Sequence, residues 1–134
     1  MASLEGSETI LVVDDEKFMR RLAVSMLERY GYNVLIATSG KEVLQMFEVW
    51  PDFKVDLAVI DIVMPEMDGF ELAERIRNIR PRLPILYMSG HPDKAELPQA
   101  LTIPFVPKPF TSLKLAGKIR EVLDTPRAAS SGAG

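Results

Sequence analysis

Acidic side chains directly follow two short apolar runs of this 134-residue sequence. Asp14 and Asp15 come after Ile-Leu-Val-Val, and Asp61 comes after Leu-Ala-Val-Ile. Two carboxylates about 4 Å apart repel one another by roughly 4 kcal/mol at an effective dielectric constant near 20. Such a cluster is tolerated when a cation or a shared proton relieves the repulsion. If the fold brings these side chains together, the sequence therefore predicts a cation site.

The chemistry that these carboxylates favour is phosphoryl transfer assisted by a divalent cation. The chain has no cysteine and a single histidine, His91. Oxygen ligands alone favour Mg²⁺, with Mn²⁺ as the alternative. Mg²⁺ coordinates phosphate oxygens, and an aspartate can act as a nucleophile that forms an acyl phosphate. Lys108 and Ser89, which follow two further apolar runs, would add an ammonium group and a hydroxyl to such a site.

The elements that must position these groups alternate between strand and helix. The apolar runs are residues 10–13, 34–37, 57–60, 85–88 and 103–106. The first four are typical of strands buried on both faces of a parallel sheet. The fifth contains Pro104, which favours an edge strand because proline cannot donate to a central ladder. The alternation predicts a three-layer α/β fold, in which ligands bind at the carboxyl ends of the strands.

Apolar residues at helical spacing lie between or after the runs. They are Phe18, Leu22, Met26 and Tyr30, with Met19, Ala23 and Leu27 beside them on the same face; Val43, Leu44 and Phe47; Leu72, Ala73, Ile76 and Ile79; and Leu115, Ala116, Ile119, Val122 and Leu123. Ser39 and Asp68, each with a glutamate three residues later, predict capping boxes. Thr111 predicts a further N-cap. Gly31 predicts that the helix before it ends with a residue of positive φ, a conformation that favours glycine. Three prolines leave room for only a shortened fourth helix, around residues 93–100.

Composition narrows the classes of function. The apolar fraction of 47% is sufficient for a core, and the net charge of −3 disfavours direct nucleic-acid binding. No apolar run reaches the roughly 20 residues that cross a bilayer, so we expect no membrane contact. The first eight residues do not resemble a signal peptide, and a cytoplasmic protein is expected. We expect residues 1–8 to be a linker or cloning remnant, 9–124 the domain and 125–134 a disordered tail.

Together, these residues resemble the response-regulator receiver domain. The matching segments are Asp14-Asp15, the run Asp61-Ile-Val-Met-Pro-Glu-Met-Asp-Gly69, Ser89, and Lys108-Pro109-Phe110. The resemblance implies a flavodoxin-like (βα)5 sandwich with a five-stranded parallel sheet of order 2-1-3-4-5. Residues 8–16, 88–90 and 105–111 are similar to receivers at the C-terminus of hybrid sensor histidine kinases.

The resemblance also implies a metal site. Asp15, Asp61 and the backbone carbonyl of Val63 would bind Mg²⁺ directly. Asp14 would act through a bound water molecule. The Asp14-Asp15 pair and Asp61 each stand directly after an apolar run, as the resemblance requires.

The remaining matching residues would carry out transfer and switching. Asp61 would be the phosphorylated residue, and Lys108 would pair with Asp61 and then with the phosphoryl group. The Lys108-Pro109 peptide would be cis. Ser89 would turn its hydroxyl onto a phosphoryl oxygen, and Phe105 would swing inward in the active state. Phe105 stands where tyrosine is also common in the family, so a tyrosine hydroxyl is missing at this position.

The implied function is that of a two-component signal transduction receiver, not a conventional enzyme. It would accept phosphate from the phosphohistidine of a histidine kinase or histidine phosphotransfer protein, and lose it by slow self-dephosphorylation. It would stand alone or be a fragment of a hybrid histidine kinase. Two alternatives stay open: a receiver-like interaction module that is never phosphorylated, and an aspartyl-phosphate hydrolase. The shortened fourth helix leaves dimerisation open, because that helix often forms the dimer face.

Overall fold

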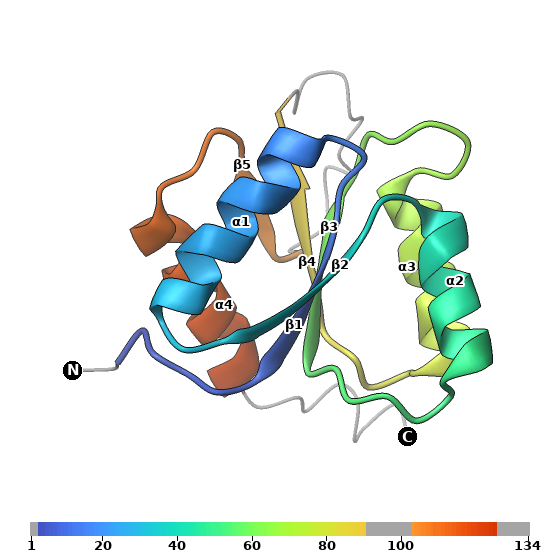
Figure 1. Cartoon of the computed structure of the whole chain (residues 1–134), viewed down its shortest axis with the longest axis horizontal. Helices are drawn as coiled ribbons and strands as arrows, with labels where there is room; N and C mark the ends of the chain where they lie inside the picture. Colours follow the sequence, from blue (N-terminus) through green and yellow to red (C-terminus); the bar gives the residue numbers. More distant parts are fainter. Residues whose placement is uncertain (1–2, 91–102, 126–134) are drawn as a thin grey trace.

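The computed structural model describes residues 3–90 and 103–125 (Figure 1). Two predictions fall partly or wholly outside the described residues. They are the shortened fourth helix around residues 93–100 and the disordered tail of residues 125–134, and His91 also lies outside the described residues.

In the described part of the chain, five parallel strands form a single sheet. They are β1 (Thr9–Val13), β2 (Asn33–Ala37), β3 (Leu57–Asp61), β4 (Ile85–Ser89) and β5 (Phe105–Pro107). Their order is β2-β1-β3-β4-β5, and all four neighbouring pairs are parallel. The predicted flavodoxin-like strand order is therefore confirmed, and the proline-containing run does supply an edge strand.

Burial separates the central strands from β2. Every residue of β1, β3 and β4 is buried, as the continuous apolar runs predict. The expectation that β2 is also buried on both faces is wrong: Asn33 is exposed and Ile36 is 49% exposed. β2 is the second edge of the sheet, because it pairs only with β1, and so it lacks a neighbour on one side.

Within residues 3–90 and 103–125, four helices complete the three layers. They are α1 (Lys17–Arg29), α2 (Gly40–Val49), α3 (Gly69–Ile79) and α4 (Ser112–Asp124). α2 and α3 cover one face of the sheet, and α1 and α4 cover the other, as Figure 1 shows. Within the described ranges, none of the helices has the length and apolar character needed to cross a membrane.

The predicted helix boundaries are set by local hydrogen bonds. The side chains of Ser39, Asp68 and Thr111 each accept a hydrogen bond from the backbone N–H three residues later, at 2.9–3.1 Å. Gly31 ends α1 with φ 97°, a conformation that favours glycine. The expected apolar face of α1 needs one correction, because Phe18 is 73% exposed while α1 buries Ala23 and Leu27.

Candidate functional site

The carboxyl ends of β1 and β3 bring three aspartates together. Asp14 and Asp15 follow β1, Asp61 is the last residue of β3, and these two strands are neighbours in the sheet. Each aspartate offers one carboxylate oxygen, and these oxygens all lie within 4.8 Å of one another. Asp14 and Asp61 are buried, whereas Asp15 is exposed. The structure thus assembles the acidic cluster that the sequence predicts.

Backbone contacts fix the position of each buried carboxylate. The Asp14 N–H donates to the Ala37 carbonyl at 3.2 Å, and the Asp14 carboxylate accepts from the Glu16 N–H at 2.9 Å. Near Asp61, the Gly69 N–H donates to the Ile62 carbonyl at 2.8 Å. Only glycine permits this approach, because a Cβ at Gly69 would lie 2.5 Å from the Asp61 carbonyl oxygen. The first turn of α3 is therefore held directly against the end of β3.

Lys108 is the cation at the centre of the cluster. Its Nζ lies 2.9 Å from Asp14 Oδ2, 3.3 Å from Asp61 Oδ2 and 3.6 Å from Glu16 Oε1. The Lys108 N–H donates to the Ser89 carbonyl at 2.8 Å, which ties the segment after β5 to the end of β4. The predicted cis Lys108-Pro109 peptide is confirmed.

The electrostatics of the cluster are dominated by burial and by surplus negative charge. Burial, together with the charge of Asp14, raises the pKa of Asp61 to about 6, although Lys108 opposes this shift. Burial lowers the pKa of Lys108, but its hydrogen bond to Asp14 and the charges of Asp14 and Asp61 outweigh that effect and raise it. One ammonium group thus serves several carboxylates, and their repulsion is only partly relieved.

The donor set fits a hard divalent cation. Three carboxylates converge without any thiolate or imidazole among the described residues near them, and the exposed Asp15 leaves a side open to solvent. The acidic cluster could therefore hold a metal ion. Val63 lies beside it, since its N–H donates to Asp61 Oδ1 at 3.4 Å, but the role of its backbone carbonyl stays a prediction.

The two predicted switch residues lie next to this site. Ser89 is fully buried at the carboxyl end of β4. Phe105, the first residue of β5, is partly buried and packs against the core cluster on the α2–α3 face of the sheet. The role of both side chains as switch residues stays a prediction.

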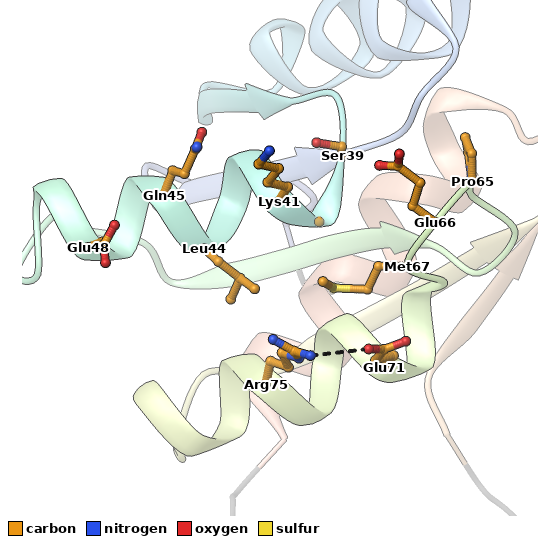
Figure 2. A pocket seen from close by; sticks show the side chains of 11 residues that line it. Ser39, Lys41, Leu44, Gln45, Glu48, Pro65, Glu66, Met67, Glu71 and Arg75 are labelled. Carbon is orange, nitrogen blue, oxygen red and sulfur yellow. Dashed lines mark hydrogen bonds and ion pairs between the residues drawn. The ribbon is translucent and has the colours of Figure 1, made fainter.

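A groove of about 410 Å³ lies between α2 and α3, beside the loop that leaves β3 (Figure 2). Met67 from this loop packs over the start of α2, where a Cβ at Gly40 would lie 2.7 Å from its sulfur. Glu66 has φ 68°, an uncommon conformation outside glycine, and the Met67 N–H donates to the Pro65 carbonyl at 2.7 Å. The contact anchors the loop that carries Val63, and none of the predicted site residues lines the groove.

Two residues that contact the acidic cluster were not predicted from the sequence. Glu16 Oε1 lies 3.6 Å from Lys108 Nζ. The position of Glu16 directly after Asp14 and Asp15 could have indicated this contact. Arg20 donates to the Asp14 carbonyl at 2.8 Å from one turn into α1. Nothing in the local sequence indicates that contact, because it depends on how α1 leaves the sheet.

Comparison with known proteins agrees with this geometry. The family model described as response regulator receiver domain matches residues 10–120, which is most of the chain. The chain therefore belongs to the receiver-domain family of two-component signal transduction. The fold and the convergence of the strand ends agree with what the resemblance of the sequence to this family implies.

The curated relatives that match this chain are longer proteins. It is 39% identical over 124 residues to the sensor kinase CckA of Brucella abortus, covering 90% of this chain and 13% of that protein. It is 34% identical to the probable transcriptional regulator ycf27 of Guillardia theta, covering 90% of this chain and 47% of that protein. The solved receiver domain of the hybrid histidine kinase CckA superposes with a TM-score of 0.71 at 31% identity, covering 86% and 98% of the two chains. The chain thus spans less than half the length of these curated relatives.

Proposed function

We propose that Asp61 is the phosphoacceptor of this receiver and that the phosphodonor is the phosphohistidine of a histidine kinase or histidine phosphotransfer protein. The observation that carries the proposal is the position of Lys108 Nζ between Asp14 Oδ2 and Asp61 Oδ2, at 2.9 and 3.3 Å. A carboxylate that must gain a negatively charged group needs a cation at this distance. The relation to CckA, a sensor kinase, supports a donor of the histidine kinase class.

The reaction follows from the positions of these side chains. An Asp61 carboxylate oxygen attacks phosphorus, the bond from phosphorus to the donor imidazole nitrogen breaks, and the electron pair stays on the imidazole, which takes up a proton. Lys108 then pairs with a phosphoryl oxygen in place of Asp61. Mg²⁺, or Mn²⁺, held by Asp14, Asp15, Asp61 and the Val63 carbonyl, would neutralise charge on the phosphoryl oxygens.

Switching would follow from Ser89, which is also one of the proposed catalytic residues, and from Phe105. The Ser89 hydroxyl would turn onto a phosphoryl oxygen, and Phe105 would move inward behind it. We further propose that the domain spans residues 9–124, that it acts in the cytoplasm and that its output goes to another protein, not directly to nucleic acid. Its net charge of −3 supports the last point.

The proposal is tested by incubation with acetyl phosphate and Mg²⁺ followed by intact-mass analysis. Wild type should gain the mass of one phosphoryl group, and Asp61→Asn should gain none. Asp52→Asn, a matched change on an exposed turn, should behave like wild type. If wild type gains no mass, or if Asp61→Asn gains as much, Asp61 is not the phosphoacceptor.

The mass analysis tests the first alternative function, and a phosphatase assay on small phosphate esters tests the second. An interaction module that is never phosphorylated would gain no mass under any condition. A hydrolase would release inorganic phosphate from small phosphate esters over many turnovers. Enzymes of that kind place an acid–base aspartate two residues after the nucleophile, whereas Val63 occupies this position here. We therefore expect only slow loss of phosphate from Asp61.

A further inference from the structure

Tyr87 lies between the switch residues and helix α3. It is on β4, two residues before Ser89, so both side chains project from the same face of the strand. It is also the register partner of Phe105 on β5. Tyr87 is almost completely buried and belongs to the core cluster against which Phe105 packs. A movement of Phe105 toward the interior therefore meets the ring of Tyr87.

The far end of the Tyr87 ring contacts α3. The rings of Phe70 and Tyr87 have centroids 5.1 Å apart and are tilted by 50°. The Tyr87 hydroxyl accepts a hydrogen bond from Arg77 Nη2 at 3.3 Å. This distance is long for an N–H···O bond, whose usual value is about 2.9–3.0 Å, so the bond can be lost at little cost. Arg77 itself is an exposed residue of α3.

We infer that Tyr87 is a positioning residue that links the Ser89–Phe105 switch to α3, and that the Arg77–Tyr87 hydrogen bond belongs to the unphosphorylated state. This inference rests on the function proposed above. When Phe105 moves inward, the Tyr87 ring shifts, the bond to Arg77 breaks, and the guanidinium is released on the surface of α3.

The physical reason is close packing. Protein interiors have few voids, so an aromatic ring that moves into the core displaces its neighbours in discrete steps. Tyr87 is the neighbour of Phe105 in register, and its ring is already in contact with Phe70 of α3. The charge of Arg77 would thus report the state of Asp61 at a distance from it, on an exposed position of α3.

The test is NMR of the full chain with Mg²⁺ and beryllium fluoride, which mimics a phosphoryl group on a carboxylate. The Arg77 side-chain N–H resonance of wild type should shift on addition, together with the amides of Ser89 and Phe105. Tyr87→Phe removes only the hydroxyl and should abolish the Arg77 shift while the two amides still respond. Tyr30→Phe, a matched change on the opposite face of the sheet, should leave all three responses intact.

Coupling gives a second readout that is independent of the Arg77 signal. If the bond stabilises the unphosphorylated state, its removal favours the other state, and by linkage Tyr87→Phe should bind beryllium fluoride about two- to fivefold more tightly than wild type. Should Tyr87→Phe fail to fold, Arg77→Gln, at an exposed position, removes the bond from the other side and should give the same gain in affinity.

The outcomes separate this inference from the proposed function. If Ser89 and Phe105 respond but the Arg77 resonance does not, or if it still shifts in Tyr87→Phe, the link through Tyr87 is wrong and the phosphoacceptor proposal stands. An affinity in both variants equal to that of wild type would also overturn the link. If no resonance responds to Mg²⁺ and beryllium fluoride, both proposals fail together.

Discussion

Two ionic clusters lie at opposite ends of the sheet and differ in charge balance. The acidic cluster, at the carboxyl ends of the strands, consists of Asp14, Asp15, Asp61 and Lys108. Its lysine is outnumbered by carboxylates, and burial together with the charge of Asp14 raises the pKa of Asp61 to about 6. The protein therefore carries a destabilising charge at this end when no further cation is present.

The Arg120 cluster, which consists of Arg120, Glu8, Asp124 and Tyr32, lies at the amino ends of the strands. Arg120 bonds both oxygens of Glu8, at 2.8 and 3.0 Å, and also Asp124 at 2.6 Å. The hydrogen bond from Arg120 lowers the pKa of Glu8. Here the carboxylates are stabilised in their charged form, and the segment before β1 is held against α4.

The comparison shows that burial and the ratio of cations to carboxylates decide what a cluster does. The Arg120 cluster is partly solvated and satisfied, so it contributes to structure alone. The acidic cluster is buried and incompletely neutralised, which is unfavourable for folding and useful for binding a cation and a phosphoryl group. The following predictions separate these two cases.

The largest effect is expected when the acidic cluster loses its lysine. Lys108→Met should slow phosphoryl uptake from acetyl phosphate by about 100-fold or more, because a fixed cation no longer meets the charge on the phosphoryl oxygens. The rate is measured by intact mass over time. Lys118→Met removes a surface lysine from α4 and should leave the rate unchanged. A normal rate in Lys108→Met would show that the ammonium group is not part of the transfer.

Backbone packing should be far tighter at the acidic cluster than on α4. Gly69→Ala should lower the free energy of unfolding by about 2–3 kcal/mol, because the new Cβ would lie 2.5 Å from the Asp61 carbonyl oxygen. A Cβ at Gly117, within α4, would have no neighbouring atom within 4 Å, so Gly117→Ala should raise the free energy of unfolding by about 0.5–1 kcal/mol. Urea unfolding measures both. Equal effects of the two changes would contradict the close approach of α3 to β3.

Removing the destabilising negative charge of Asp61 should stabilise the metal-free protein. Asp61→Asn should raise the free energy of unfolding by about 2 kcal/mol at neutral pH with a chelator present. The folded-state pKa of Asp61, about 6, lies above its reference value of 3.8, so the cost of ionisation develops as the pH rises between these values. The advantage of the variant should therefore vanish near pH 4. A variant that is less stable than wild type at neutral pH would contradict the account.

The smallest effect is expected at the Arg120 cluster. Glu8→Gln should cost about 0.5–1 kcal/mol at neutral pH, as for a partly exposed ion pair. The pKa of Glu8 lies below its reference value of 4.5 in the folded protein, so this stabilisation is present above pH 4.5 and is lost as the pH falls through the folded-state value. Urea unfolding across this range measures it, with Glu5→Gln as the exposed control. A cost that does not change with pH would rule out the ionic origin.

Much of the fold could be predicted because its signals are local. Continuous apolar runs marked β1, β3 and β4, and the side chains of Ser39 and Asp68 marked helix starts. The convergence of Asp14, Asp15, Asp61 and Lys108 could be predicted as well, because parallel strands place their carboxyl ends at one edge of the sheet. The residue that follows a predicted strand can therefore be expected to lie near the residues that follow the other strands, even when they are far apart in the sequence.

Other features depend on neighbours that no local pattern reveals. The exposure of Ile36 follows from the edge position of β2, and the exposure of Phe18 follows from which side of α1 meets the sheet. The contact between Glu8 and Arg120 joins residues more than 100 positions apart. The pKa of Asp61 depends on its depth of burial and its distance from Asp14, both of which are set by tertiary packing.

The dependence of stability on Mg²⁺ tests the central claim most directly. The free energy of unfolding of wild type at neutral pH should rise with Mg²⁺ concentration, by about 2.7 kcal/mol at 100 times the dissociation constant. Asp61→Asn, which lacks one of the three clustered carboxylates, should gain much less. If Mg²⁺ leaves the wild type unchanged, or stabilises both proteins equally, the acidic cluster is not the cation site that the account requires.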